Sequence, residues 1–188
     1  MTAHDIAIAG ADALFSTRPV RGRCAAVVLL LCVATPAIAQ PSALDRRVHP
    51  FSTDSQRRAA DLASWATVSA AVGLDVVLGC RHVTGPVCRR ALVMSGIRLG
   101  VTAGVATALK VAVHRTRPCA PSCGADNPNF SFPSGHTAFA FSAMGGGRAS
   151  VMLPLAVGTG GLRVAAGKHW LTDTLAGAAL GWVTSGIR

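Results

Sequence analysis

The sequence predicts an all-α protein embedded in a membrane, and three observations support this prediction. Hydrophobic residues make up 51% of the 188 residues and charged residues only 14%, whereas soluble domains average about 25% charged residues. The long apolar segments are apolar on all sides, which is typical of buried or membrane helices. No segment shows the period-two alternation of a strand. We expect one domain of about five helices embedded in a membrane, and the alternative is a soluble exported bundle.

The N-terminal segment has the pattern of a secretory signal peptide. Three arginines precede an apolar run at 24–35, and an Ala-x-Ala site follows at 37–39. A basic region, a short apolar region and a small-residue cleavage site define such a signal. We therefore predict a signal peptide over residues 1–39, cleaved after Ala39. The alternative is an uncleaved first helix, although the run is short for a span of about 20 residues.

The rest of the chain divides into an irregular lead-in at 40–58 and a helical bundle at 59–188. Prolines and asparagine predict a loop at 114–133, and glycines mark breaks between later helices. The apolar segments between these breaks predict helices over residues 59–80, 87–113, 134–148, 151–166 and 169–186.

The distribution of positive charge predicts how a membrane-embedded bundle would be oriented. The turn at 81–90 carries three arginines and a histidine, and cytoplasmic loops are enriched in such residues. The 114–133 loop would then face the exterior. The helices at 134–148 and 151–166 reach only about 23 Å, less than the roughly 30 Å of a bilayer core. Their length is the main argument for the soluble alternative.

The cysteines divide by location. Cys119 and Cys123 lie in the predicted outer loop, where oxidising conditions favour a disulfide. Cys80 and Cys88 flank the predicted inner turn, and we expect them to stay reduced. A zinc site is the alternative, but spacings of seven and three residues do not match the usual zinc patterns.

Charge and composition argue against two classes of function. The formal net charge of +10 could indicate a nucleic-acid partner, but the arginines are dispersed and the chain has two lysines, three tryptophans and no tyrosine. No basic helix face interleaved with aromatic residues is visible, so we expect no nucleic-acid binding. All eight acidic residues are aspartates, and they are far apart in sequence, which disfavours catalysis by paired carboxylates.

Three clusters of polar residues stand out in the C-terminal half. Isolated cations in apolar segments are costly unless an anion meets them, and phosphate is the simplest anion for three cations. The clusters read Lys110-x6-Arg117-Pro118, Pro133-Ser134-Gly135-His136 and Arg163-x5-His169-x3-Asp173.

The third cluster could supply a nucleophile. His169 and Asp173 are four residues apart and would stack on one face of a helix that begins near His169. Asp173 could then accept from one imidazole nitrogen and leave the other free to attack. Taken alone, the pair is also explained as an ordinary i,i+4 ion pair.

The other two clusters could bind the phosphate group. A helix start at Ser134 and Gly135 would offer backbone amides to an anion, and His136 could act as general acid. Lys110 and the guanidinium groups of Arg117 and Arg163 would supply positive charge. Taken alone, these residues are also explained as a helix N-cap and a snorkelling lysine. We interpret His114 and Arg115 as loop residues that contact the substrate.

In this order, the three clusters resemble the signature of the type 2 phosphatidic acid phosphatase family over about the last 80 residues. The resemblance implies a helical phosphatase that uses no metal or other cofactor. It implies that His169 forms a phosphohistidine, that His136 protonates the leaving group and that Asp173 orients His169. Phosphate ligands would be Lys110, Arg117, Ser134, Gly135 and Arg163. One departure is Leu162, where the family often has serine.

The resemblance leaves the substrate and several alternatives open. We expect a lipid phosphate or diphosphate as substrate and a bacterial-type inner membrane as location, with the site facing the periplasm or exterior. The alternatives are an inactive membrane scaffold or lipid carrier, a soluble exported acid phosphatase, and a vanadate-dependent haloperoxidase. Haloperoxidases with this signature are much larger proteins. The sequence does not indicate an oligomeric state.

Overall fold

The computed structural model describes residues 39–48, 50, 53–81, 85–145 and 149–187. Within these residues the chain forms five α-helices and one short 3-10 helix, η1, with no strand, which confirms the all-α prediction. The predicted signal peptide lies outside the described residues, except for Ala39. The elements are η1 (Asp45–Arg47), α4 (Asp54–Cys80), α5 (Pro86–Val113), α6 (Gly135–Ser142), α7 (Ala149–Ala165) and α8 (Leu171–Ser185).

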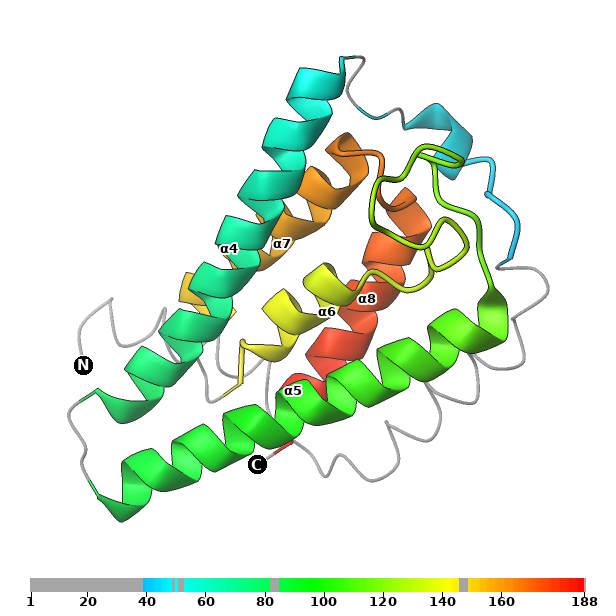
Figure 1. Cartoon of the computed structure of the whole chain (residues 1–188). Coiled ribbons are helices and arrows are strands. Elements are labelled where there is room, and N and C mark those ends of the chain that lie inside the picture. Colours follow the sequence, from blue (N-terminus) through cyan, green and yellow to red (C-terminus); the bar gives the residue numbers. More distant parts are fainter. Residues whose placement is uncertain (1–38, 49, 51–52, 82–84, 146–148, 188) are drawn as a thin grey trace, which may run out of the picture.

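Helices α4 and α5 form a V that opens away from the turn between them, and α6 and α8 lie inside its opening (Figure 1). α4 begins after Thr53, whose hydroxyl accepts a hydrogen bond from the Gln56 amide at 3.3 Å. α5 begins at Pro86, which suits the first helical position because its ring fixes φ and its missing N–H has no helical partner. Both helices are long and apolar enough to cross a membrane.

Three of the helix boundaries that differ from the sequence prediction bear on the site. α4 begins at Asp54 rather than 59, because Thr53 caps it within the segment expected to be irregular. α6 ends at Ser142, ahead of the glycines that were expected to end it near 148. At about 12 Å, α6 is far too short to cross a bilayer. α8 begins at Leu171, so His169 precedes the helix and does not stack above Asp173 within it.

Both cysteine pairs form disulfides. The predicted Cys119–Cys123 bond is present. The prediction that Cys80 and Cys88 stay reduced is wrong for this structure, because they too are bonded. Their Cα atoms are 4.5 Å apart across the α4–α5 turn, which lies within the range for a disulfide. The prediction considered only the compartment of the turn and not its geometry. Because all four sulfurs are bonded in pairs, they form no zinc site here.

A buried ion pair joins α4 to α5 closer to their turn. The Asp75 carboxylate accepts from Arg98 Nη2 at 2.7 Å and also from the Ser95 hydroxyl. Gly145 leaves room for the guanidinium, since a Cβ atom there would lie 2.7 Å from Arg98 Cζ. This contact anchors the base of the V and lies outside the three polar clusters.

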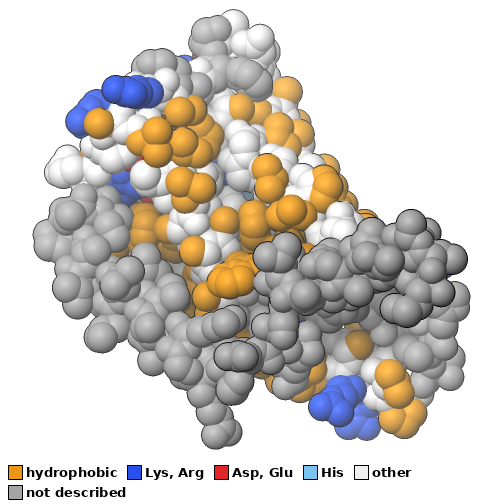
Figure 2. All heavy atoms as spheres, turned by 180° about the vertical axis from the view of Figure 1, so that it is seen from behind, with side chains coloured by type: hydrophobic (Ala, Val, Ile, Leu, Met, Phe, Trp, Pro, Cys, Tyr) orange, Lys and Arg blue, Asp and Glu red, His pale blue; other side chains and the backbone are white. Residues whose placement is uncertain are grey.

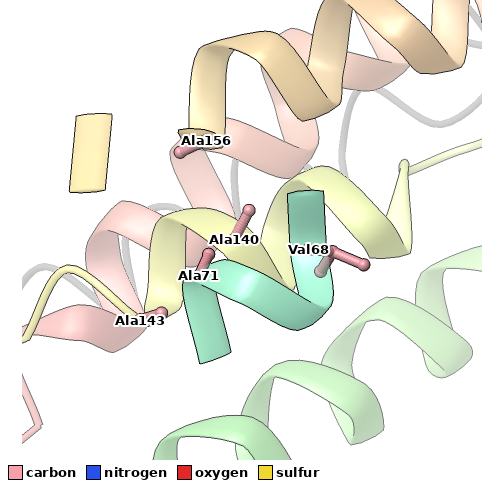
Figure 3. Close-up of a cluster of buried hydrophobic side chains, with 5 residues drawn as sticks. All are labelled: Val68, Ala71, Ala140, Ala143 and Ala156. Atoms are coloured by element: carbon pink, nitrogen blue, oxygen red, sulfur yellow. The ribbon is translucent and has the colours of Figure 1, made fainter. Parts of the chain in front are cut away.

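Small side chains allow the helices to approach closely. One buried cluster joins α4, α7 and the α6 segment through Val68, Ala71, Ala140, Ala143 and Ala156 (Figure 3).

Two glycines of α8 bring that helix against α6. A Cβ atom on Gly177 would lie 2.4 Å from the Ser134 carbonyl oxygen, and one on Gly181 would lie 2.2 Å from the Ala138 oxygen. Real Cβ atoms do not approach so closely. The start of α6, which carries the second polar cluster, is therefore fixed by its contact with α8.

Candidate active site

The three polar clusters come together at the open end of the helical bundle. There the 114–133 loop, η1 and the link between α7 and α8 lie next to one another (Figure 1). Hydrogen bonds connect these segments, including Ser134 N to Asp173 O at 3.0 Å and Arg117 Nη1 to Lys168 O at 2.8 Å. Residues up to 63 positions apart in sequence thus share one site.

Lys110 lies in the last turn of α5 and points into this end of the bundle. Its Nζ donates to the carbonyl oxygens of Phe130 at 3.0 Å and Pro133 at 2.7 Å. An ammonium group has three donors. These two acceptors are neutral, so they position Lys110 without cancelling its charge.

Arg117 is buried and is also held by carbonyl groups. Its Nε donates to Asn127 O at 2.9 Å, and its Nη1 donates to Lys168 O. The same Nη1 lies 3.5 Å from His169 Nε2, and Nη2 lies 4.0 Å from Asp126. Arg117 therefore presents its charge beside the imidazole of His169.

Arg163, in α7, is the third cation, and it is paired with a carboxylate that the sequence analysis did not assign to the site. Its Nη1 donates to Asp61 of α4 and lies 3.3 Å from the Ser64 hydroxyl. Its Nε is buried without a hydrogen-bond partner in the described part of the chain. Asp61 also lies 3.8 Å from Lys168 Nζ. The only sequence signal for Asp61 was an acid that interrupts an apolar helix.

Lys168 adds a fourth cation next to His169. Its Nζ donates to Asp126 at 2.8 Å and to the Cys123 carbonyl at 3.0 Å. It therefore connects the α7–α8 link to the disulfide-bonded loop. No motif had indicated this residue, because a lysine beside a histidine has no distinctive spacing.

His169 has a defined tautomer and is almost fully buried. Its Nδ1 lies 2.6 Å from the backbone oxygen of Ser131. Because a carbonyl can only accept, Nδ1 carries the proton, and Nε2 carries a lone pair that faces Arg117 Nη1. Burial lowers the pKa of His169 to about 3, against the raising effect of Asp173, and the cations Arg163 and Arg117 act with burial. His169 is therefore neutral near pH 7.

The sequence predicts that Asp173 accepts a hydrogen bond directly from His169, but the structure shows no such bond. The distance from its Oδ2 to His169 Nδ1 is 3.8 Å, which is too long for a hydrogen bond. Oδ2 instead accepts from the Ser131 hydroxyl at 2.5 Å and from the Trp170 amide at 2.8 Å. Asp173 thus acts on His169 through Ser131 and through the start of α8.

Arg115, expected from the sequence to be a loop residue that contacts the substrate, is instead buried and paired with two carboxylates. Its side chain is 1% exposed. Nη1 donates to Asp173 Oδ1 at 2.5 Å, and Nη2 donates to Asp45 Oδ2 at 2.7 Å. Asp45 was placed in an irregular lead-in, and no local pattern had linked it to the site. His114, the other residue expected to contact substrate, is exposed, and its ring lies edge-on to Phe130.

The second cluster begins α6. Ser134 is fully buried, and its hydroxyl lies 2.9 Å from the hydroxyl of Thr137. Gly135 is the first residue of the helix, and amides at such a start have no partner within the helix. These amides and the helix dipole favour an anion at this position.

His136 packs edge-on against Trp65 of α4, with ring centroids 4.1 Å apart. Its Nε2 is buried without a hydrogen-bond partner in the described part of the chain. Burial lowers the pKa of His136 to about 3, and Arg163 is the nearby cation that adds most to this effect. A bound dianion would offset those cations and raise the pKa again.

A known protein family matches the region of the chain that carries this site. The family model of the PAP2 superfamily matches residues 91–187, about half of the chain. The chain belongs to the PAP2 superfamily. The matched region contains all eight predicted site residues, whereas Asp45 and Asp61 lie outside it. Neither the curated proteins nor the solved structures include a match.

PAP2 membership confirms the family resemblance seen in the sequence. It supports a phosphatase-type function and a phosphate-containing substrate. PAP2 proteins are generally phosphatases. Membership and the two long apolar helices are also consistent with association with a membrane.

Proposed function

We propose that this PAP2 protein hydrolyses a lipid phosphate or diphosphate monoester, without a metal ion, through a phosphohistidine intermediate. The observation that carries the proposal is the geometry of His169. Its Nδ1 is bonded to the Ser131 oxygen, and its Nε2 faces Arg117 at 3.5 Å. A neutral imidazole with a fixed lone pair beside a guanidinium suits attack on a phosphate held by that guanidinium.

In the first step the phosphoryl group transfers to His169. Nε2 forms a bond to phosphorus while the bond between phosphorus and the leaving oxygen breaks. Lys110, Arg117 and Arg163 bind the non-bridging oxygens, together with Ser134 and the Gly135 amide. The imidazole becomes positively charged as the N–P bond forms, and the Asp173 carboxylate at 3.8 Å stabilises that charge.

His136 supplies the proton for the leaving group. Its low pKa reflects burial and the nearby cations, so it is protonated only when an anion offsets them. Binding of the phosphate dianion thus favours the protonated form that the first step needs. In the second step His136 accepts a proton from water, the water oxygen bonds to phosphorus, and the N–P bond breaks to release inorganic phosphate.

An apolar pocket beside the site supports an amphiphilic substrate. The pocket has a volume of about 670 Å³ and lies in the V between α4 and α5, within the usual size range of ligand pockets. Phe139, one helical turn after His136, lines it. The other lining residues are Val68, Ser69, Val72, Gly73, Leu99, Gly100 and Ala103. A hydrocarbon tail in this pocket would leave its phosphate at the open end of the bundle.

The outer surface supports a location in a bacterial-type inner membrane. Hydrophobic side chains gather between two groups of basic residues at opposite ends of the rear face (Figure 2). Exposed apolar residues include Leu62, Trp65, Val77, Leu92, Val93, Ile97, Val101 and Val111 of α4 and α5. In the proposed orientation the site faces the periplasm or exterior, and the arginines near the α4–α5 turn face the cytoplasm.

The test is phosphate release by purified protein in detergent and excess chelator, across a panel of lipid phosphates and diphosphates. We expect release by the wild type and none by His169→Ala, because the variant lacks the imidazole that would form the covalent intermediate. Vanadate should inhibit competitively by mimicking the transition state. Turnover by His169→Ala would refute the assigned nucleophile. A folded wild type that is silent on every substrate would favour an inactive scaffold or lipid carrier.

A further inference from the structure

The segment before α4 is bound to the back of the proposed active site through one buried carboxylate. Asp45 is 1% exposed. Its oxygens accept from the amide of Thr172 at 2.9 Å and from the Thr172 hydroxyl at 2.8 Å. They also accept from the amide and hydroxyl of Ser42, both at 2.9 Å. Burial alone would raise the pKa of Asp45, but these hydrogen bonds lower it to about 2, so Asp45 is ionised at neutral pH.

Asp45 is connected to Asp173 by a single guanidinium. Arg115 donates Nη2 to Asp45 at 2.7 Å and Nη1 to Asp173 at 2.5 Å. The exposed fraction of each of these three side chains is 1% or less. In a site so poorly solvated, the position of each charge depends on its partners, because water cannot replace them.

Asp173 is connected to the imidazole of His169 through Ser131. Its Oδ2 accepts from the Ser131 hydroxyl, and the carbonyl of the same Ser131 accepts from His169 Nδ1. A continuous chain of hydrogen bonds therefore runs from Asp45 through Arg115, Asp173 and Ser131 to His169. Each of its links is between 2.5 and 2.7 Å long.

We propose that Asp45 and Arg115 are positioning residues of this site, which hold Asp173 and Ser131 so that His169 keeps Nε2 turned towards Arg117. This inference rests on the proposed function for its kinetic consequences. Neither residue would touch the substrate. The site of this PAP2 protein would then extend beyond the region matched by the family model and include the segment at 40–48.

The charge balance explains why the effect falls on turnover and not on substrate binding. Two carboxylates and one guanidinium leave a net charge of −1 behind His169. That charge stabilises the positive imidazole ring that forms with the N–P bond. In Asp45→Asn the net charge becomes zero, and Arg115 neutralises Asp173 more completely. The phosphate ligands Lys110 and Arg117 are held by carbonyl groups elsewhere and keep their positions.

The experiment compares Asp45→Asn with Arg46→Ala. Arg46 lies in the same segment, is exposed, and donates to the Pro41 carbonyl, so its loss loosens the segment without touching the hydrogen-bond chain. We expect Asp45→Asn to lower kcat at least tenfold with KM within twofold of the wild type, and Arg46→Ala to change neither. A kcat within twofold of the wild type in folded Asp45→Asn would overturn the proposal. So would equal losses in the two variants.

A second measurement does not depend on turnover. Nitrogen-15 spectra of labelled histidine report which ring nitrogen of His169 carries the proton. We expect Nδ1–H in the wild type and in Arg46→Ala, and a mixture of tautomers in Asp45→Asn. Should Asp45→Asn not fold, Arg115→Lys decides the question, because it keeps the positive charge but replaces the two-nitrogen bridge between Asp45 and Asp173 with a single ammonium group. Unchanged kcat and spectrum in Arg115→Lys would then refute the proposal.

The two measurements separate this inference from the proposed function. An active wild type with a silent His169→Ala supports the function whatever Asp45 does. A silent wild type whose His169 spectrum changes in Asp45→Asn contradicts the function and supports the positioning role. An unchanged spectrum together with unchanged kcat removes Asp45 from the site and leaves the phosphatase proposal intact.

Discussion

The Nδ1 atom of His169 donates to the backbone oxygen of Ser131 at 2.6 Å, whereas the carboxylate of Asp173 is 3.8 Å away. The tautomer is therefore set by a main-chain group, and Asp173 acts one step behind it. This arrangement predicts a graded response to mutation. A side-chain change at Ser131 keeps the carbonyl, whereas a change at Asp173 removes the group that holds both Ser131 and Arg115.

Ser131→Ala and Asp173→Asn should therefore differ in severity. Ser131→Ala loses one hydrogen bond to a carboxylate, and we expect kcat to fall about tenfold, which corresponds to the lower end of the free energy of a hydrogen bond to a charged group. Asp173→Asn also loses the charge that faces the imidazole, so its loss should be larger. The measurement is kcat for each variant on the best substrate. An unchanged rate in Asp173→Asn would remove Asp173 from the site.

Arg117 should not be replaceable by lysine. Its guanidinium donates to the Asn127 and Lys168 carbonyls through two different nitrogens while facing His169. A lysine has a single nitrogen and cannot hold this geometry. We expect Arg117→Lys to lower kcat/KM by roughly 10- to 100-fold, the equivalent of one charged hydrogen bond. Arg90→Lys, at the other end of α5, serves as control and should behave as the wild type.

The folded protein should lose stability in acid. His136 and His169 have pKa values lowered to about 3 in the fold, against 6.5 as the reference value. Between about pH 6.5 and 3 the unfolded chain therefore binds protons at these positions that the folded protein does not. The free energy of unfolding falls as pH decreases through this window. The pKa of Asp45 is lowered from 3.8 to about 2, so this carboxylate extends the loss of stability to lower pH.

Thermal unfolding midpoints measured in detergent from pH 8 to 4 test this prediction. The midpoint should fall below about pH 6.5. The slope should be shallower in His169→Ala, which removes one of the two buried imidazoles. A midpoint that does not change between pH 7 and 4.5 would contradict the burial of both histidines as neutral groups.

Gly177→Ala should disturb the site although residue 177 binds nothing. The added methyl group would lie 2.4 Å from the Ser134 carbonyl oxygen, which is backbone and cannot turn aside. α6 would have to shift, carrying Gly135 and His136 with it. We expect a loss of about 1–3 kcal/mol in stability, as for other overpacked sites, and reduced kcat. Gly161→Ala has open space around its Cβ and is the matched control; equal behaviour of the two would contradict the close contact.

The number and type of the α-helices could be predicted because their signals are local. Apolar runs bounded by glycine and proline predicted five helices, and the motif spacing predicted the cations that the structure brings together. The end of α6 could not be predicted, because α6 stops at Ser142 before any helix-breaking residue occurs. The roles of Ser131 and Asp45 could not be predicted either. One acts through a main-chain carbonyl, which any residue carries, and the other pairs with Arg115 across 70 positions.

Arg115 and Asp61 show why charge counts in the sequence were insufficient. Both lie near the predicted site in space, but their partners decide what they do. Arg115 forms ion pairs with two buried carboxylates, and its side chain is only 1% exposed, so no face is accessible to a substrate. Asp61, in the apolar helix α4, forms an ion pair with Arg163 and offsets its positive charge. A pattern of isolated charges identifies where an ionic site lies, but pairing across helices determines its net charge.

α5 has a disulfide at each end, Cys80–Cys88 near its start and Cys119–Cys123 beyond its last residue. Such bonds persist in exported compartments and are reduced in the cytosol. A helix that crosses the inner membrane exposes its two ends to these two environments. A chain isolated with both bonds intact would have both ends of α5 on the exported side, which would contradict the orientation proposed above. A chain with only Cys119–Cys123 oxidised would have the α4–α5 turn in the cytosol, as proposed. Mass spectrometry after alkylation of the free thiols would therefore report both the oxidation state of these cysteines and the topology of α5.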